Sequence, residues 1–381
     1  MSDSEPEFTI GVEEEYLLTN GATRDLESDP PHDFMAECEK ALESRVSPEF
    51  LRCQVEVGTP VCRSLREARS ELSHLRRTIA EIAGRYDLVP LAVSTHPFAE
   101  WTRQRHTDKE RYNALAQDMQ VVAQRLLICG MHVHVALPDD GTRIDLMNQL
   151  TYFLPHLLAL STSSPFWQGR SSGLKSYRLS VFDELPRTGL PESFSSFDEY
   201  ARTVGTLVDA GLIEDATKIW WDLRPSARFP TLEMRVTDVC SLIDDAMTIA
   251  ALYLCLIRML WRLRRNNQRW RNYSRFLVNE NRWRAQRYGV SEGQVDFGKG
   301  ALVPFADLID EFVDLVRDDA VHFNCVAEVE HAREIVRRGT SADRQLAAYR
   351  AAIEAGAGES EALRQVIDLL AGEFLTGCAP A

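Results

Sequence analysis

The sequence predicts an α+β fold, and three observations support this prediction. Short runs with alternating apolar and polar residues, such as LRCQVEVGTPVC (51–62), indicate strands that follow one another like hairpins. Stretches with apolar residues three and four positions apart indicate helices between and after these strands. No linker or internal repeat divides the chain. One domain over 1–381 is therefore expected, with a mainly helical C-terminal part over 241–372.

The expected elements alternate along the chain until the helical part begins. They are strands at 8–18 and 51–62, a helix from Ser64 to Gly84, a strand at 89–94, a helix at 108–127, a strand at 128–137, a helix at 145–163, a loop at 164–196, a helix at 198–209 and a strand pair at 217–239. Ser64 and Glu67 have the spacing of a capping box, and Gly84 is a suitable stop. The loop is long and rich in Gly, Pro and Ser, as functional loops often are.

Composition and charge narrow the class of protein. A net charge of −14 argues against nonspecific binding to nucleic acid or to an anionic membrane. The acidic N-terminus MSDSEPEF has no secretory signal pattern, and the apolar run 246–257 is shorter than the about 20 residues that span a bilayer. The eight cysteines lack a CxxC pair, which favours reduced thiols. A cytoplasmic protein with neither nucleic-acid nor membrane partners is expected.

Four strand-like runs each carry a pair of polar residues two positions apart. The pairs are Glu13 and Glu15, Gln54 and Glu56, His132 and His134, and Glu233 and Arg235. Alternate residues of a strand share one face, so each pair points one way and Glu14 points the other. A single pair of this kind is also expected on an ordinary strand with one solvent-exposed face. Four such faces predict that carboxylates and imidazoles converge on one sheet, where divalent cations would relieve their repulsion.

The residue types indicate a hard, oxygen-rich site that suits Mg²⁺ or Mn²⁺. Zinc remains open by ligand type, although the chain has no HExxH spacing. Mg²⁺ held by carboxylates usually completes its shell with water and substrate phosphate, which points to nucleotide chemistry. The run 169–176 (GRSSGLKS) does not have the spacing of a phosphate loop. Metal ions and Arg or Lys side chains are therefore expected to bind the phosphates.

Several ordered blocks resemble the YbdK-like carboxylate–amine ligases, also called glutamate–cysteine ligase type 2. They are GVEEEY (11–16), QVEVGTPVC (54–62), STHPFAEW (94–101), GMHVHV (130–135), SSPFWQGRSSGLKSYR (163–178), PRTGLP (186–191), IWWDLRPSARFPTLEMRVTDVC (219–240) and NRWRAQRYG (281–289). The resemblance implies an ATP-dependent carbon–nitrogen ligase of the EC 6.3.2 type. It also implies a glutamine synthetase-like catalytic domain, with a central, mainly antiparallel sheet and helices packed on its outer face.

The wider group is similar to glutamine synthetase, whose sheet carries G-x-E-x-E, G-M-H-x-H and x-E-x-R strands. By that resemblance Glu13, His132 and Glu233 would hold the metal that contacts ATP phosphates. Glu15 and Glu56 would hold a second metal near the acyl group.

The resemblance also implies a reaction. A substrate carboxylate would attack the γ-phosphorus of ATP, and an amine would then displace phosphate from the acyl phosphate. Arg235 is the candidate for stabilising the transferring phosphoryl group, and His134 for contacting phosphate or substrate. The candidates for binding the carboxylate substrate or phosphate are Arg170, Lys175, Arg178, Arg187 and Arg224.

Three other functions remain open: a phosphagen-type kinase, a metal-dependent amidohydrolase, and a catalytically silent nucleotide-binding protein. Amide formation from ATP, an acid and an amine would exclude the kinase. Activity that does not depend on ATP would favour the hydrolase. Failure to bind Mg·ATP would favour the catalytically silent protein. The partners expected are small carboxylate and amine substrates, whose identity the residues do not specify, and the helical part allows a homodimer interface.

Overall fold

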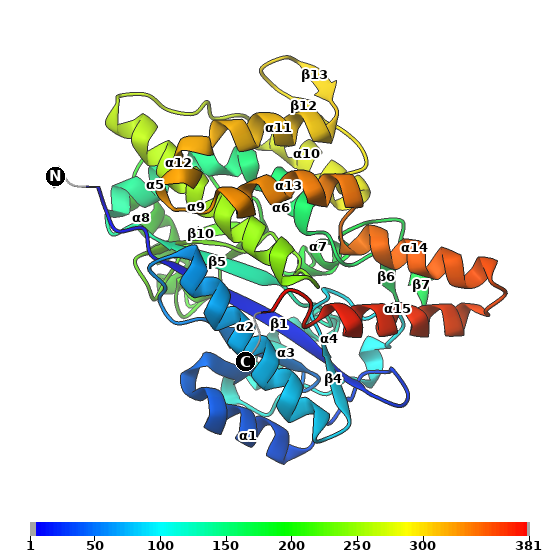
Figure 1. Cartoon of the computed structure of the whole chain (residues 1–381). Coiled ribbons are helices and arrows are strands. Elements are labelled where there is room, and N and C mark those ends of the chain that lie inside the picture. Colours follow the sequence, from blue (N-terminus) through cyan, green and yellow to red (C-terminus); the bar gives the residue numbers. More distant parts are fainter. Residues whose placement is uncertain (1–4, 379–381) are drawn as a thin grey trace.

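A seven-stranded sheet lies at the centre of the protein in the computed structural model, which describes residues 5–378 (Figure 1). Six of its strands follow the order β10-β11-β5-β1-β3-β2, and β4 pairs with the far end of β1. Neighbouring strands are antiparallel throughout. These strands are β1 (Ile10–Asn20), β2 (Val46–Pro48), β3 (Gln54–Gly58), β4 (Leu88–Leu91), β5 (Met131–Ala136), β10 (Leu223–Pro225) and β11 (Thr231–Met234). The expected α+β fold with a mainly antiparallel sheet is confirmed.

Three two-stranded sheets lie outside the main sheet. They are formed by β6 (Phe166–Trp167) with β7 (Arg170–Ser171), β8 (Thr188–Gly189) with β9 (Trp220–Trp221), and β12 (Gln294–Asp296) with β13 (Ala301–Val303).

Helices make up most of the remaining chain. They are α1 (His32–Leu42), α2 (Leu65–Gly84), α3 (Glu110–Met119), α4 (Val121–Gln124), α5 (Asp140–Leu150), α6 (Leu154–Ser161), α7 (Arg178–Phe182), α8 (Phe197–Asp209), α9 (Ile243–Arg265), α10 (Arg275–Tyr288), α11 (Phe305–Leu315), α12 (Arg317–His322), α13 (Val326–Arg338), α14 (Ser341–Glu354) and α15 (Glu359–Glu373).

Helices α2 and α9 pack against the sheet on its outer face (Figure 1). Ser64 caps α2 by accepting a hydrogen bond from the backbone N–H of Glu67, as its sequence predicts. Most of α9 is fully buried. Its 23 residues are long and apolar enough to cross a membrane, but 78% of the most apolar window is buried inside the protein. Burial between the sheet and the C-terminal helices accounts for this apolar composition.

One buried ion pair joins α2 to the central strand. Arg76 of α2 donates from Nε and Nη2 to the two carboxylate oxygens of Glu14, at 2.9 and 2.7 Å. The Tyr16 hydroxyl donates to the same carboxylate at 2.6 Å. The remaining N–H groups of Arg76 reach the carbonyls of Cys240, Ser241 and Phe374. Glu14 therefore lies on the outer face with every charge paired, as the alternation predicts.

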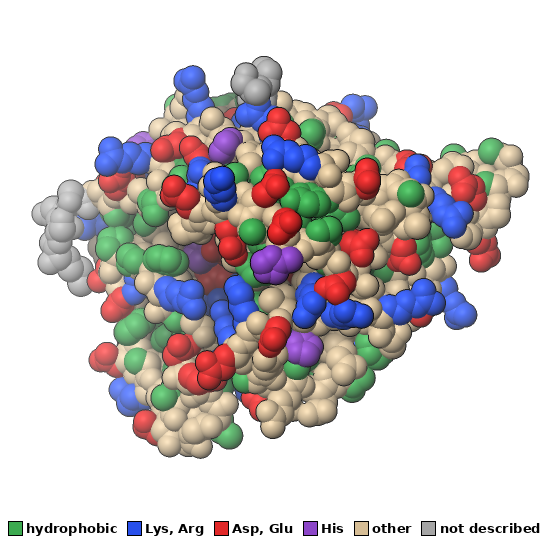
Figure 2. Space-filling model, turned by 90° about the horizontal axis from the view of Figure 1, so that it is seen from below, with side chains coloured by type: hydrophobic (Ala, Val, Ile, Leu, Met, Phe, Trp, Pro, Cys, Tyr) green, Lys and Arg blue, Asp and Glu red, His purple; other side chains and the backbone are tan. Residues whose placement is uncertain are grey.

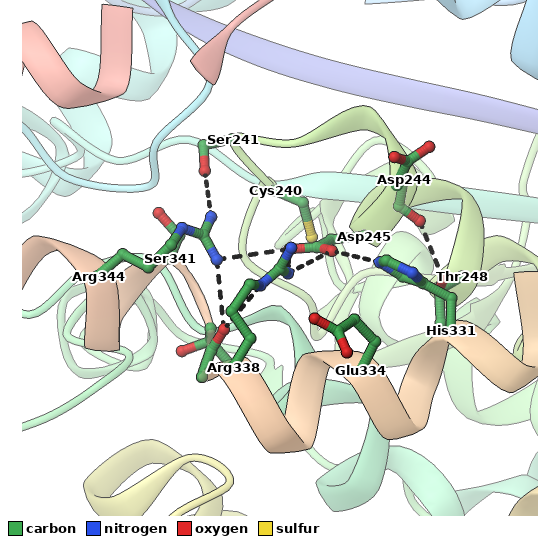
Figure 3. Close-up of polar contacts among 12 residues, drawn as sticks. Cys240, Ser241, Asp244, Asp245, Thr248, His331, Glu334, Arg338, Ser341 and Arg344 are labelled. Atoms are coloured by element: carbon green, nitrogen blue, oxygen red, sulfur yellow. Dashed lines mark hydrogen bonds and ion pairs between the residues drawn. The ribbon is translucent and has the colours of Figure 1, made fainter. Parts of the chain in front are cut away.

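The C-terminal helices are tied to α9 through Asp245, which is buried (Figure 3). Its carboxylate accepts hydrogen bonds from Arg338 at 2.7 Å and from His331 at 3.0 Å, both on α13. Arg344 of α14 lies close by and pairs with Glu373 of α15 at 2.7 Å. This network fixes α13–α15 against the start of α9.

Two helices expected as continuous are interrupted. The helix expected at 108–127 is divided between α3 and α4 because Gln120 has a φ of 52°. The helix expected at 145–163 is divided between α5 and α6, and Pro155, which has no N–H to donate, lies in the first turn of α6. Neither interruption changes the order of the sheet.

Candidate active site

The register of the sheet brings the four polar pairs onto one face. Directly paired residues of antiparallel strands point to the same side. The facing pairs are Glu15 with Glu56, Glu13 with His132, Glu233 with His134, and Arg224 with Glu233. A row of titratable side chains therefore crosses five strands from β3 to β10. The predicted convergence of these segments on one sheet face is confirmed.

This row lies in a cavity of about 330 Å³ on the face of the sheet opposite α2. Aromatic and apolar side chains complete its walls, among them Phe50, Tyr112, Trp220 and Phe229. Figure 2 shows a hollow with acidic and histidine side chains in its depth and Lys or Arg side chains along its rim. A concave site with convergent polar groups is typical of an active site.

Three carboxylates form one end of the site. Oxygens of Glu15, Glu49 and Glu56 all lie within 4.8 Å of one another. Burial and the charge of Glu49 raise the pKa of Glu15 to about 8, and Arg178 and the Gly130 N–H offset this only in part. Burial and the charges of Glu49, Glu13 and Glu15 raise the pKa of Glu56 well above its ordinary value. Three oxygen ligands with this mutual repulsion fit a hard divalent cation such as Mg²⁺ or Mn²⁺.

Glu13 and the two histidines form the middle of the site. Glu13 lies 3.2 Å from Nδ1 of His132 and 3.4 Å from Nε2 of His134. Burial would raise the pKa of Glu13, but hydrogen bonds and charges from both histidines outweigh it, so the pKa is lowered. Burial and Arg235 lower the pKa of His132 to about 4, which keeps its imidazole neutral. Its Nε2 is buried without a hydrogen-bond partner among the described residues, as a metal-ligating nitrogen would be.

Glu233 and two arginines form the other end. Arg224 donates to both oxygens of Glu233, at 3.0 and 3.1 Å, and Arg235 forms a second ion pair with Glu233. Burial would raise the pKa of Glu233, but the charges of Arg235 and Arg224 outweigh it and lower it strongly. Both Glu233 oxygens are thus engaged by guanidinium groups. Because the site has three carboxylates at one end and two arginines at the other, it can hold a cation beside a polyanion.

Arg178 also lies in the wall of the cavity, at the start of α7. Its guanidinium packs on Gly130, where a Cβ atom would lie only 2.4 Å from Nη2. Gly130 also donates its N–H to Glu15 at 2.7 Å. The absence of a side chain at position 130 therefore allows Arg178 to approach the carboxylate end of the site.

The structure places the other predicted loop cations away from the cavity. Arg170 is exposed on the β6–β7 hairpin. Lys175 forms an ion pair with Asp343 of α14. Arg187 donates to the Lys218 carbonyl at 2.9 Å and packs on Trp220, so it lies behind the cavity wall. Of the twelve predicted site residues, these three do not line the cavity.

Four further charged residues line the cavity without having been predicted: Glu49, Arg111, Lys218 and Arg228. Glu49 follows Ser47 by two positions, and Ser47 faces Glu56, so the alternation of β2 places Glu49 on the same side. This strand has only three residues and was not recognised. Arg111 is on α3, Lys218 ends a short 3₁₀ helix and Arg228 lies in a bend, where spacing carries no comparable signal.

Comparison with known proteins gives consistent results. The model of the family "Glutamate-cysteine ligase family 2" matches residues 9–367. A protein of Rhodospirillum rubrum named "Putative glutamate--cysteine ligase 2" is 60% identical over 370 residues, covering 96% of this chain and 95% of that protein. One of the same name from Jannaschia sp. is 58% identical over 371 residues, covering 97% and 98%.

A solved structure is similar at lower identity. The crystal structure of a glutamate–cysteine ligase from Francisella tularensis, in complex with AMP, has a TM-score of 0.69 and 13% identity. The match covers 99% of this chain and 91% of that one. At this identity the likeness establishes a shared fold.

Proposed function

The chain belongs to glutamate–cysteine ligase family 2, and on that premise we propose that it joins a carboxylate to an amine at the expense of ATP. It is an ATP-dependent carbon–nitrogen ligase of the EC 6.3.2 type. The acid and amine best supported by the names of its relatives are L-glutamate and L-cysteine.

One observation carries this proposal for the site. Glu15, Glu49 and Glu56 meet within 4.8 Å in the same cavity as Arg224 and Arg235. Without a cation, three adjacent carboxylates repel one another, so their proximity favours a metal-dependent reaction. Two half-buried guanidinium groups at the other end favour a phosphorylated substrate.

In the proposed reaction, the carboxylate oxygen of the acid attacks the γ-phosphorus of ATP and ADP leaves. The amine then attacks the acyl carbon, phosphate leaves, and an amide forms. Arg235 and Arg224 would neutralise charge on the transferring phosphoryl group, and His134 would contact the phosphate or the substrate. Arg178 would orient an anionic group beside the carboxylate end. Aromatic walls would exclude water from the acyl phosphate, which hydrolyses readily.

Mg²⁺ or Mn²⁺ would be held by Glu15, Glu49 and Glu56. A second ion at Glu13, His132 and Glu233, which the family resemblance implies, would require Glu233 to give up a guanidinium contact, because Arg224 and Arg235 bind both of its oxygens. Such ions supply charge neutralisation on phosphate oxygens. The pairing of the strands holds the carboxylate end and the arginine end of the site apart and sets the orientation of their side chains.

A coupled assay of ADP release tests the proposal. Wild-type protein with Mg·ATP, L-glutamate and L-cysteine should release ADP in step with amide formation, and a wider panel of amino acids follows if this pair is poor. ADP release with phosphorylation of the acceptor and no amide would instead indicate a kinase. Amide hydrolysis without ATP would indicate a hydrolase, and failure to bind Mg·ATP would indicate a silent protein.

The same proposal includes a cytoplasmic location and a homodimer. A cytoplasmic location is supported by eight free thiols, seven of them buried. A homodimer would be checked by light scattering at several protein concentrations.

A further inference from the structure

Asp238, which follows β11, holds together the two ends of the loop between α6 and α7. Its Oδ2 accepts hydrogen bonds from the Ser163 N–H at 2.9 Å and the Ser164 hydroxyl at 2.8 Å. Its Oδ1 accepts one from the Ser176 hydroxyl at 2.8 Å. The carboxylate is fully buried. A buried carboxylate with three donors from both ends of one loop fixes the distance between those ends.

The closed loop determines where Arg178 lies. The backbone N–H of Arg178 donates to the Ser164 hydroxyl at 3.1 Å, and Ser164 donates in turn to Asp238. From there the guanidinium reaches the carbonyls of Arg235 and Val236, at 3.2 and 3.4 Å. Nε of Arg178 is buried without a hydrogen-bond partner among the described residues. The guanidinium therefore has one donor, against Gly130, that no described protein group uses.

The C-terminal helices brace the same loop from the other side. Gln345 of α14 donates to the Ser163 carbonyl at 2.8 Å, and the Ala342 N–H donates to the Thr162 carbonyl at 3.0 Å. Lys175 pairs with Asp343 of the same helix. Both ends of the loop are thus held between Asp238 and the first turn of α14.

We propose that Asp238 is a positioning residue of the ligase: by joining Ser163, Ser164 and Ser176 it fixes Arg178 over Gly130, in the direction needed to bind an anionic substrate group. This inference rests on the proposed function, because the position of Arg178 affects turnover only if the cavity binds such a group. Asp238 itself does not line the cavity. Its effect must therefore pass through Arg178.

Asp238→Ala, Asp238→Asn, Arg178→Ala and the double variant test the inference through separate KM values for ATP and for the acid. Asp238→Ala should raise the same KM as Arg178→Ala, by about 10- to 100-fold. Asp238→Asn should restore most of this loss, because an amide can accept from Ser163 and Ser164 and donate to Ser176. The double variant should match Arg178→Ala within about twofold, as for residues that act through one another.

Asp319→Ala is the matched control, since Asp319 is also buried and multiply paired, but with Arg258 and Arg262 of α9 and not with the loop or α14. It should lower stability and leave both KM values unchanged. If Asp238→Ala does not fold, Ser176→Ala removes one hydrogen bond and should raise the same KM by about three- to tenfold. Ser291→Ala, which removes a hydroxyl bonded to the Tyr288 carbonyl, is its control.

A crystal structure of the Asp238→Ala or Ser176→Ala variant gives a readout that needs no turnover. The inference expects the guanidinium of Arg178 to leave Gly130. The inference is overturned if the guanidinium stays in place or if the KM is unchanged from wild type. It is also overturned if the KM of the double variant is much higher than that of Arg178→Ala. If wild-type protein releases no ADP with any acid and amine, the proposed function fails, and the crystal structure still decides the role of Asp238.

Discussion

Two neighbouring glutamates of β1, Glu14 and Glu15, lie on opposite faces of the sheet and in opposite electrostatic environments. Glu14, on the outer face, has a guanidinium and a hydroxyl bound to its carboxylate and no exposure to solvent. Glu15, on the inner face, lies against two other carboxylates, and its pKa is raised to about 8. A buried carboxylate whose charge is fully compensated has a structural role. A cluster whose charge protein groups compensate only in part is suited to the proposed role of binding a cation.

Removal of Arg76 should have the largest effect, because it leaves the buried charge of Glu14 without its partner. Arg76→Leu should lower the free energy of unfolding by about 3–5 kcal/mol, measured by urea denaturation. Glu14→Leu with Arg76→Leu should recover part of this loss. A double variant as unstable as the single one would mean that the carbonyl contacts of Arg76, and not its ion pair, stabilise the outer face.

Neutralising one carboxylate of the inner face should lower activity without lowering stability. Glu56→Gln should lower ligase activity by about 100-fold, because it removes an oxygen charge needed for the cation. Its metal-free unfolding free energy at pH 8.5 should not fall, since the change relieves repulsion among Glu15, Glu49 and Glu56. Loss of stability comparable with that of Arg76→Leu would contradict the contrast between the faces.

The raised pKa of Glu15 predicts a pH dependence of smaller size. Folded protein retains a proton on Glu15 between pH about 4.5 and 8, whereas unfolded protein has lost it. The stability contributed by this group is therefore full at low pH and is lost as pH rises toward 8. Cation binding needs the deprotonated form, so Mg²⁺ should raise Tm more at pH 8 than at pH 6, by roughly 2–4 °C. An equal rise in Tm at both pH values would argue against Glu15 as a ligand.

The smallest effect is expected for Lys175, whose ion pair with Asp343 lies outside the cavity. Lys175→Met should change either KM by less than about twofold and lower the unfolding free energy by about 0.5–1 kcal/mol. Lys299→Met, at an exposed ion pair on the β12–β13 hairpin, serves as the control. A tenfold rise in the KM for ATP would show that Lys175 reaches the substrate after a movement of the loop.

The strand residues of the site were predictable because a strand has a period of two. Spacing placed the members of each pair on one face of their own strand and Glu14 on the other face. The recurrence of four such pairs predicted a shared sheet face, and the register agrees. Glu49 was not predictable in this way, because β2 has three residues and ends at Pro48. Loop cations have no period, so only the fold separates Arg178 from Lys175. The break at Gln120 was also missed, since no glycine marks its positive φ.

The burial of α9 has a consequence for how the protein is made. Its outer side is covered largely by α12 and α13, which begin more than 50 residues later in the chain. While the ribosome synthesises those residues, a helix long and apolar enough for a bilayer has no partner on that side. Nascent chains that end before Val326 should therefore associate with chaperones or membranes, whereas the completed chain should not.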